Sequence, residues 1–187
     1  MKAAIFGAGN LSPGDWACTE AERLGQSLAG LGCEVWTNGN GGVAEAVSKG
    51  TAESGGCAVG VHMSMRPTSN RFLTRSFNPS CHTNVVDQCL GVMGHLLHAD
   101  VLVFFAGGID TLASFLVLLT VCRMMVDRKS TIFMVMKGQG DIPDFRDRLS
   151  HLGISQPFFN DHVIGVHSAR EVIGMIQQLA SPKCVLA

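Results

Sequence analysis

Short apolar segments alternate with longer amphipathic segments along most of the chain. The apolar segments are rich in Val, Ile and Phe, which is typical of strands buried on both faces of a parallel sheet. They predict six strands, at residues 3–6, 34–37, 57–61, 101–105, 131–136 and 162–166. The amphipathic segments predict helices at residues 14–31, 42–54, 84–98, 110–126, 144–152 and 168–179. This alternation predicts one α/β domain over residues 1–187.

The order of the elements predicts a Rossmann-like, doubly wound parallel sheet with helices on both faces. Parallel strands joined by helices need right-handed crossovers, and two consecutive halves then give the strand order 3-2-1-4-5-6. In that order the strands that end at Phe6 and Phe105 are central neighbours. Ligands bind beyond the carboxyl ends of such strands, so we expect the loops after both residues to face one crevice. The segment 62–83 holds Pro67 and Pro79 without a clear period, and it is interpreted as a functional or mobile loop.

Three glycine-rich loops follow predicted strands. Their residues are Gly7, Ala8, Gly9 and Asn10; Asn38, Gly39, Asn40, Gly41 and Gly42; and Gly107, Gly108, Ile109, Asp110 and Thr111. Glycines let backbone N–H groups approach an anion, and the start of a following helix favours negative charge. The loops therefore predict a phosphate site, to which the Thr111 hydroxyl adds a hydrogen bond. Plain turns are the structural alternative, because Asp110 can cap its own helix and repel a phosphate.

The first loop lacks the full fingerprint of a dinucleotide-binding protein. Ser12 stands where a third glycine is needed, and Thr37 and Asn38 stand where an acidic residue would end the second strand. These differences argue against NAD, and we expect no cofactor. His95 and His98 lie on one predicted helix without a recognised metal spacing, so no metal site is expected either.

Two of the loops lie in segments that resemble the SLOG superfamily. The segment NGNGGVAEAVSKGTAESGG, at residues 38–56, and the following CAVGV resemble a glycine-rich turn, helix and strand of that superfamily. The segment AGGIDTLAS, at residues 106–114, is similar to the family motif PGGxGTxxE. The resemblance runs from about Ala3 to Met136. The superfamily includes the Lonely Guy (LOG) phosphoribohydrolases, which activate cytokinins, and proteins once labelled possible lysine decarboxylases.

The resemblance implies a Rossmann-like pocket for nucleoside monophosphates, hydrolysis of the bond between base and ribose 5′-phosphate, and a dimer. In the motif, Ser114 occupies the position of the final Glu, and Asp110 occupies that of a glycine. A serine hydroxyl cannot carry the charge of a glutamate, so we expect a nucleotide- or sugar-phosphate-binding protein with a degenerate phosphoribohydrolase motif. Two alternatives stay open: an active nucleotide N-glycosidase with a relocated carboxylate, and a carrier or regulatory module for another phosphorylated ligand.

Candidate catalytic and charge-neutralising residues follow from these alternatives. The candidate catalytic residues are Glu45, Asp110 and Ser114. The candidate phosphate clamp consists of Arg66, Arg71 and Arg75. Loop arginines are also common on solvated surfaces, which is the other interpretation of this clamp. Whether the protein is an enzyme stays open, and an active form would be a hydrolase of nucleoside monophosphates.

The composition of the chain limits which partners and which cellular location we expect. A net charge of −1 lacks the basic field that nucleic-acid binding needs, so we expect a small-molecule ligand and no nucleic acid. Neither a secretory signal nor a segment of the ~20 apolar residues of a membrane span is found, so no membrane is expected. Seven cysteines without a CxxC pair favour reduced thiols and a cytoplasmic protein. The helix at residues 111–126 is apolar on nearly all faces, which predicts a homodimer through it.

Overall fold

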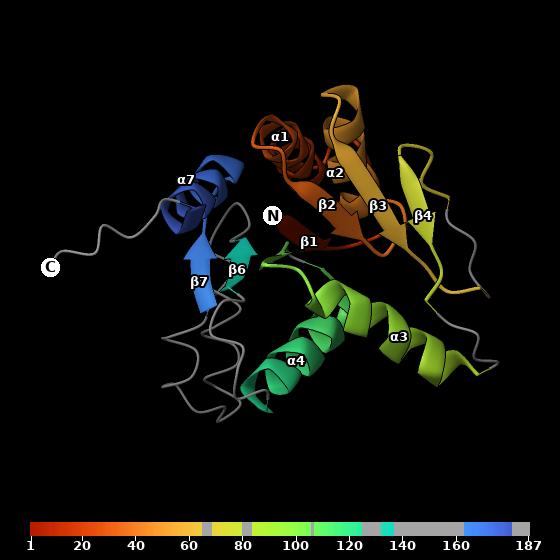
Figure 1. Cartoon of the computed structure of the whole chain (residues 1–187). Helices are drawn as coiled ribbons and strands as arrows, with labels where there is room; N and C mark the ends of the chain where they lie inside the picture. Colours follow the sequence, from red (N-terminus) through yellow and green to blue (C-terminus); the bar gives the residue numbers. More distant parts are fainter. Residues whose placement is uncertain (65–68, 80–83, 106, 125–131, 137–162, 181–187) are drawn as a thin grey trace, which may run out of the picture.

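A parallel sheet of seven strands forms the centre of the computed structural model, which describes residues 1–64, 69–79, 84–105, 107–124, 132–136 and 163–180 (Figure 1). The strands are β1 (Lys2–Phe6), β2 (Glu34–Thr37), β3 (Cys57–Val61), β4 (Arg75–Phe77), β5 (Val101–Phe104), β6 (Ile132–Met136) and β7 (Val163–Val166). They lie in the order β4-β3-β2-β1-β5-β6-β7, and every neighbouring pair is parallel. The sheet is therefore wound outward from β1 in both directions. The predicted Rossmann-like fold class is confirmed, with β4 as an additional edge strand.

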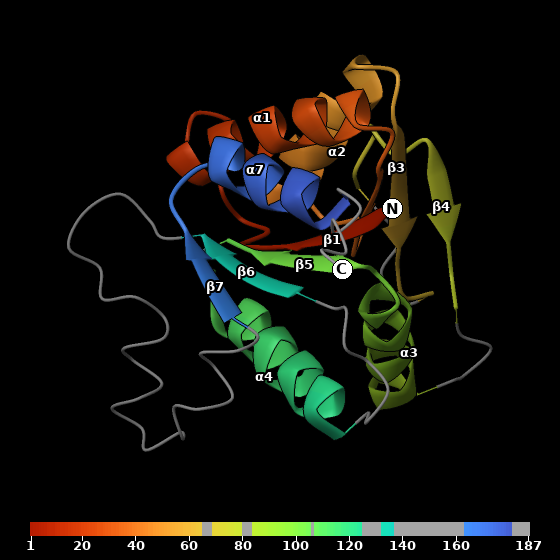
Figure 2. The ribbon, with the colours of Figure 1, turned by 60° about the vertical axis from the view of Figure 1, so that its left-hand side comes forward.

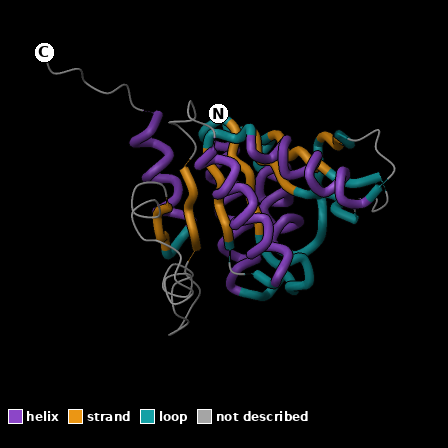
Figure 3. The backbone as a smooth tube through the Cα atoms, turned by 90° about the horizontal axis from the view of Figure 1, so that it is seen from below, coloured by secondary structure: helices purple, strands orange, loops and turns teal. Residues whose placement is uncertain are grey.

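The described helices cover both faces of this sheet (Figure 2). One face carries α1 (Trp16–Gly30), α2 (Val43–Glu53) and α7 (Ala169–Ala180), and the other carries α3 (Val85–Leu97) and α4 (Ile109–Met124). A view from below shows the strands running side by side with helices packed against them (Figure 3). These helices confirm the predicted ones to within the usual uncertainty of helix ends. The helix predicted at residues 144–152 lies outside the described residues.

Two apolar cores, one on each face, hold the helices against the sheet. β1 lies at the centre, and its residues Ala3, Ala4 and Ile5 are at most 1% exposed. The first core joins β1 and β5 to α1, α2 and α7. In the second core the Phe104 ring stacks on the Phe6 ring, with centroids 4.5 Å apart, and Phe115 of α4 meets Phe104 edge-on. Because Phe6 and Phe104 are register partners, the carboxyl ends of β1 and β5 lie at one level.

The edge strand β4 lies within the segment that sequence analysis interpreted as a loop. It pairs with β3, and Thr74 N–H donates to Ala58 C=O beside this pairing. The Asn70 side chain donates to Ser48 Oγ at 3.0 Å and so ties the segment to α2. The loop interpretation is therefore wrong for residues 75–77. All three residues of β4 are exposed, so the strand has no apolar pattern from which it could be predicted.

Two glycines allow α1 and α2 to pack backbone against backbone. Gly25 of α1 lies against Val47 C=O and Thr51 N–H of α2, and Gly50 of α2 lies against Glu22 C=O of α1. A Cβ atom at either glycine would overlap these backbone atoms. Side chains at these positions would force the helices apart, because a packed interior has little room to yield. The contact therefore fixes the position of α2 against α1. It also fixes the start of α2, which lies near the carboxyl ends of the strands.

Replacing Gly50 by Ala should destabilise the protein, because the added methyl group meets the Glu22 carbonyl, which cannot move without α1. We expect the free energy of unfolding, measured by urea denaturation, to fall by about 1–3 kcal/mol. Gly174→Ala is the matched control, since Gly174 lies inside α7 with nothing within 4 Å of its Cβ position. That variant should gain about 0.5–1 kcal/mol from its higher helix propensity. Equal stabilities of the two variants would contradict this account of the α1–α2 contact.

Candidate functional site

The loop after β1 lies between the loops that follow β2 and β5. β1 pairs with β2 on one side and with β5 on the other. Phe105 N–H donates to Phe6 C=O at 2.8 Å, and Val43 N–H donates to Ala8 C=O at 3.1 Å. The three glycine loops that the sequence singles out therefore meet at the carboxyl ends of the central strands.

Glycines allow the first and second loops to touch. A Cβ atom at Gly7 would lie 2.7 Å from the Val43 side chain. Gly42 has a φ of +61° and a ψ of −127°, a backbone conformation that residues with a side chain rarely adopt. A Cβ atom at Gly42 would also overlap Ala8 C=O. Glycine is therefore required at position 42 both by the backbone conformation and by the contact between the loops.

Gly107 brings the third loop against the first. A Cβ atom at Gly107 would overlap the Thr111 hydroxyl and lie 3.1 Å from Ala8 N. The Thr111 hydroxyl thus lies over its own loop. The exposed residues that follow are Gly108, Ile109 and Asp110. Ala8 is consequently in contact with both neighbouring loops, which makes it the centre of the cluster.

The helix α2 begins without a side-chain cap. Its N-cap position is Gly42, which has no side chain to offer. Among the described residues, no acceptor takes the N–H groups of Ala44 and Glu45 in a hydrogen bond. These donors lie at the positive end of the helix, just beyond the carboxyl ends of the strands. An anion placed there would accept hydrogen bonds from both.

The turn ahead of Gly42 is held by its own side chains. Thr37 Oγ1 accepts a hydrogen bond from Gly39 N–H at 3.1 Å, and Asn38 Oδ1 accepts one from Asn40 N–H at 3.2 Å. The exposed residues of the first two loops are Gly9, Asn10 and Asn40. The second loop therefore has a fixed shape of its own, and its exposed residues lie on the solvent side of the cluster.

The candidate catalytic residues lie at the starts of two helices. Glu45 is half-buried in the first turn of α2, and its Oε2 lies 3.8 Å from the Cβ position of Gly41. Asp110 is exposed in the first turn of α4. The Ser114 hydroxyl donates to Asp110 C=O at 2.9 Å within the same helix. The structure thus brings Glu45 to the contact of the first two loops, whereas the Ser114 hydroxyl is engaged by its own backbone.

Sequence analysis missed two groups at the start of α1. Asp15 precedes the helix, which predicts an N-cap, but its carboxylate instead accepts a hydrogen bond from Ser12 N–H at 2.7 Å and closes the connection to the first loop. Burial raises the pKa of the Cys18 thiol, and the carboxylates of Asp15 and Glu45 raise it further. The thiol is therefore held in its protonated form, which argues against Cys18 as a nucleophile.

Arg75 lies at the amino ends of the strands, whereas the glycine loops lie at their carboxyl ends. Its Nη2 donates to Glu34 Oε1 at 2.6 Å and to Cys57 Sγ at 2.8 Å, and these two residues begin β2 and β3. The hydrogen bond from Arg75 lowers the pKa of the Glu34 carboxyl, and one from Trp36 adds to the effect. The prediction that Arg75 belongs to a phosphate clamp is therefore corrected: its side chain links the amino ends of three strands.

Arg71 also lies outside the loop cluster. It is exposed, with its guanidinium 5.1 Å from the centre of the Phe72 ring. The hydrogen bond to Glu22 raises the pKa of Lys49, in the second half of α2, and the charge of Arg71 opposes this weakly. That end of the helix points away from the glycine loops. Arg66, the third residue of the predicted clamp, lies outside the described residues.

A family model described as the SLOG cluster4 family matches residues 1–126. This chain belongs to the SLOG cluster4 family. The match contains all three glycine loops and both helices that begin at them, and it confirms the SLOG resemblance of the sequence. No protein of curated function matches the chain.

Solved structures share the fold of this SLOG protein along nearly its whole length. The X-ray structure of TM1055, a structural genomics target, has a TM-score of 0.72 and 21% identity, covering 95% of this chain and 98% of that one. The molybdenum cofactor carrier protein from Chlamydomonas reinhardtii has a TM-score of 0.63 and 18% identity, covering 97% and 98%. DNA processing protein A from Helicobacter pylori, which binds single-stranded DNA, has a TM-score of 0.64 and 15% identity, covering 95% and 80%. At such identities the likeness establishes the fold alone.

These neighbours bear on the predicted partners of the SLOG protein. Because a protein of the same fold binds single-stranded DNA, the fold gives no support to the expectation that nucleic acid is not bound. That expectation rests on the net charge of −1 and stays a prediction.

The described part of the SLOG protein contains neither a cluster of metal-binding side chains nor a membrane-spanning helix. Within the described ranges, no group of three or more His, Cys, Asp or Glu side chains could hold a metal ion. The His95 ring packs edge-on against the Phe77 ring, with centroids 4.9 Å apart. Of the helices in the described part of the chain, none has the length and apolar character to cross a membrane.

Proposed function

We propose that this SLOG protein binds a nucleotide or a related sugar phosphate at the three glycine loops, with the phosphate at the start of α2. The observation that carries the proposal is the pair of N–H groups of Ala44 and Glu45, which have no acceptor among the described residues. They lie beside the contact of the first two loops, where Val43 N–H already donates to Ala8 C=O. A phosphate oxygen is the acceptor that an uncapped helix start favours.

The carboxylates around the loops favour a ligand that carries more than a phosphate. Glu45 and Asp110 each lie in the first turn of a helix, where their charges compete with that of a phosphate. Carboxylates accept hydrogen bonds from the hydroxyl groups of a ribose. A molecule that joins a sugar to a phosphate therefore suits both the amides and the acids, whereas inorganic phosphate suits the amides alone.

In this proposal the phosphoribohydrolase activity is lost or altered. Ser114 stands at the Glu position of the motif, and its hydroxyl donates to Asp110 C=O, so it supplies no negative charge to a developing oxocarbenium ion. Glu45 is the candidate for a relocated catalytic carboxylate, because its Oε2 lies close to Gly41 at the contact of the loops. A carrier role for another phosphorylated ligand is the further alternative, supported by the fold shared with the molybdenum cofactor carrier protein.

The proposal includes a cytoplasmic homodimer with α4 in its interface. Among the described cysteines, Cys18, Cys33, Cys57 and Cys89 form no disulfide, as a reducing compartment favours. At the two ends of α4, Ile109 and Met124 are each 75% exposed. The neighbouring helix α3 also exposes Val86 and Leu90. A second copy of the chain that covered this apolar surface would remove it from water.

A panel of nucleoside 5′-monophosphates tests the ligand and the chemistry together. At least one of them should raise the melting temperature of the protein without releasing free base, because ligand binding stabilises the native state and the charged catalytic group is replaced. Melting is followed by scanning fluorimetry and base release by liquid chromatography. A single-stranded oligonucleotide in the same panel tests the expectation that nucleic acid is not bound.

The variant Gly42→Ala should remove the stabilisation by nucleotide, since a methyl group there displaces Ala8 and distorts the start of α2. Gly14→Ala is the matched control, because Gly14 is exposed with nothing within 4 Å of its Cβ position.

Release of free base that is abolished by Glu45→Gln would instead establish the active hydrolase. A protein that no phosphate compound stabilises would contradict the proposed ligand class.

The homodimer is tested by light scattering at micromolar concentration. The natural chain should show about twice the monomer mass of 19.9 kDa. Thr120→Glu should shift the protein to the monomer, because Thr120 is exposed on α4 and a charge there opposes burial in the interface. Gln178→Glu places the same charge on an exposed position of α7 and should leave the dimer intact. A natural chain of monomeric mass would refute the dimer.

A further inference from the structure

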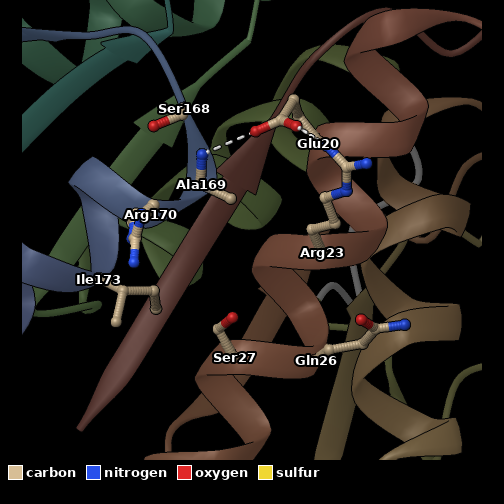
Figure 4. A pocket seen from close by; sticks show the side chains of 8 residues that line it. All are labelled: Glu20, Arg23, Gln26, Ser27, Ser168, Ala169, Arg170 and Ile173. Carbon is tan, nitrogen blue, oxygen red and sulfur yellow. Dashed lines mark hydrogen bonds and ion pairs between the residues drawn. The ribbon is translucent and has the colours of Figure 1, made fainter.

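A groove of about 480 Å³ lies between α1 and α7, on the outer surface of their helical layer (Figure 4). α1 contributes Arg23, Gln26 and Ser27 to its walls, and α7 contributes Arg170 and Ile173. None of these residues belongs to the glycine loops or to α2. A space of this size admits a small molecule of metabolite size. The groove is therefore a second possible location for a ligand, separate from the loop cluster.

Glu20 forms a fixed base for this groove. It is only 6% exposed, and its Oε2 accepts a hydrogen bond from Ala169 N–H at 2.9 Å, at the start of α7. Its Oε1 accepts one from Arg23 Nη1 at 2.7 Å. The Glu20 carboxylate thus links α1 to α7 and orients the guanidinium of Arg23 (Figure 4). Because both carboxylate oxygens have donors, Glu20 repels an incoming anion less than an unpaired acid would.

Arg170 supplies a positive charge that Glu20 does not neutralise. It lies in the first turn of α7, and among the described residues no ion pair involves its guanidinium. Ser168 caps this helix: Glu171 N–H donates to Ser168 Oγ at 3.3 Å, and Glu171 Oε2 accepts from His167 N–H, just before the cap, at 3.0 Å. The Glu171 carboxylate is thus held at the cap and not by Arg170. Two guanidinium groups against one buried carboxylate leave the lining of the groove with a positive charge.

We propose that the groove between α1 and α7 binds a small organic oxyanion, with Arg23 and Arg170 contacting its carboxylate or phosphate group from opposite walls. Guanidinium groups present paired N–H donors that match the oxygens of either group. The side chains of Gln26 and Ser27 offer further hydrogen bonds, and Ile173 offers an apolar contact for the carbon skeleton. Whether the oxyanion is a carboxylate or a phosphate is decided by the experiment.

The test is a titration of the ¹⁵N-labelled protein with succinate and, separately, with inorganic phosphate, at constant ionic strength. Saturable shifts of the amide signals of Ser27, Ala169 and Arg170 are expected with at least one of the two probes. Arg170→Gln should weaken that binding about tenfold, the loss expected for one charge-assisted hydrogen bond. Arg71→Gln removes the same charge at an exposed position outside the groove and should change the affinity by less than about twofold.

Each outcome of the titration decides the proposal independently of the proposed function. Saturation by succinate alone or by phosphate alone supports it and names the group that is recognised. An absence of saturable shifts at the groove with both probes overturns it. Shifts that Arg170→Gln leaves unchanged also overturn it. Shifts confined to the glycine loops would overturn the groove as an oxyanion site while supporting the phosphate site at α2.

Discussion

The close approach of three backbone loops around Ala8 is the constraint on which the rest of this structure depends. Gly42 and Gly107 lie against the Ala8 backbone from the two neighbouring loops. A side chain at Gly42 would overlap Ala8 C=O, and one at Gly107 would overlap the Thr111 side chain and lie 3.1 Å from Ala8 N. The hydrogen bond from Val43 N–H to Ala8 C=O then joins the start of α2 to the loop after β1. Through these contacts, loops that are far apart in the sequence form one surface at the edge of the sheet.

The fold supplies this constraint from two directions. The buried centre of the sheet sets the ends of β1 and β5 at one level, through the register of Phe6 and Phe104. The glycine contact between α1 and α2 sets the position of α2 from the other side. A helix held in this way can present its first N–H groups to a ligand without reorganising, and pre-organised donors of this kind bind an anion more tightly because less ordering is needed. The N–H groups of Ala44 and Glu45 have that arrangement.

Much of this architecture could be predicted from the sequence, because it depends on local signals. Apolar runs and helical periods predicted six of the described strands and the winding of the sheet. Glycine clusters after three strands predicted the loop cluster, since the winding of the sheet brings those loops together. The signal failed at β4, whose short, exposed segment has no apolar period. The sequence also misplaced Arg75, because a charged residue in a long segment without a clear period does not reveal which strands lie beside it.

Contacts between segments far apart in the sequence could not be predicted, for a different reason. The hydrogen bond between Ala169 N–H and the Glu20 carboxylate joins residues 149 positions apart. No sequence pattern at either residue indicates the other as its partner. The uncapped start of α2 could have been noticed, because Gly42 precedes the helix where a capping side chain is usual. The φ of +61° at Gly42 could not be predicted from the sequence. This backbone conformation requires glycine, so the start of α2 has no capping side chain.

The central claim is that backbone amides at the start of α2 receive the phosphate of a ligand. It is tested most directly by adding adenosine 5′-monophosphate to the ¹⁵N-labelled protein and following the amide signals. The account predicts that the largest shifts fall on Ala44 and Glu45, with smaller ones on Gly9, Gly41 and Gly108. Saturable binding that shifts other parts of the chain and leaves Ala44 and Glu45 unchanged would contradict it.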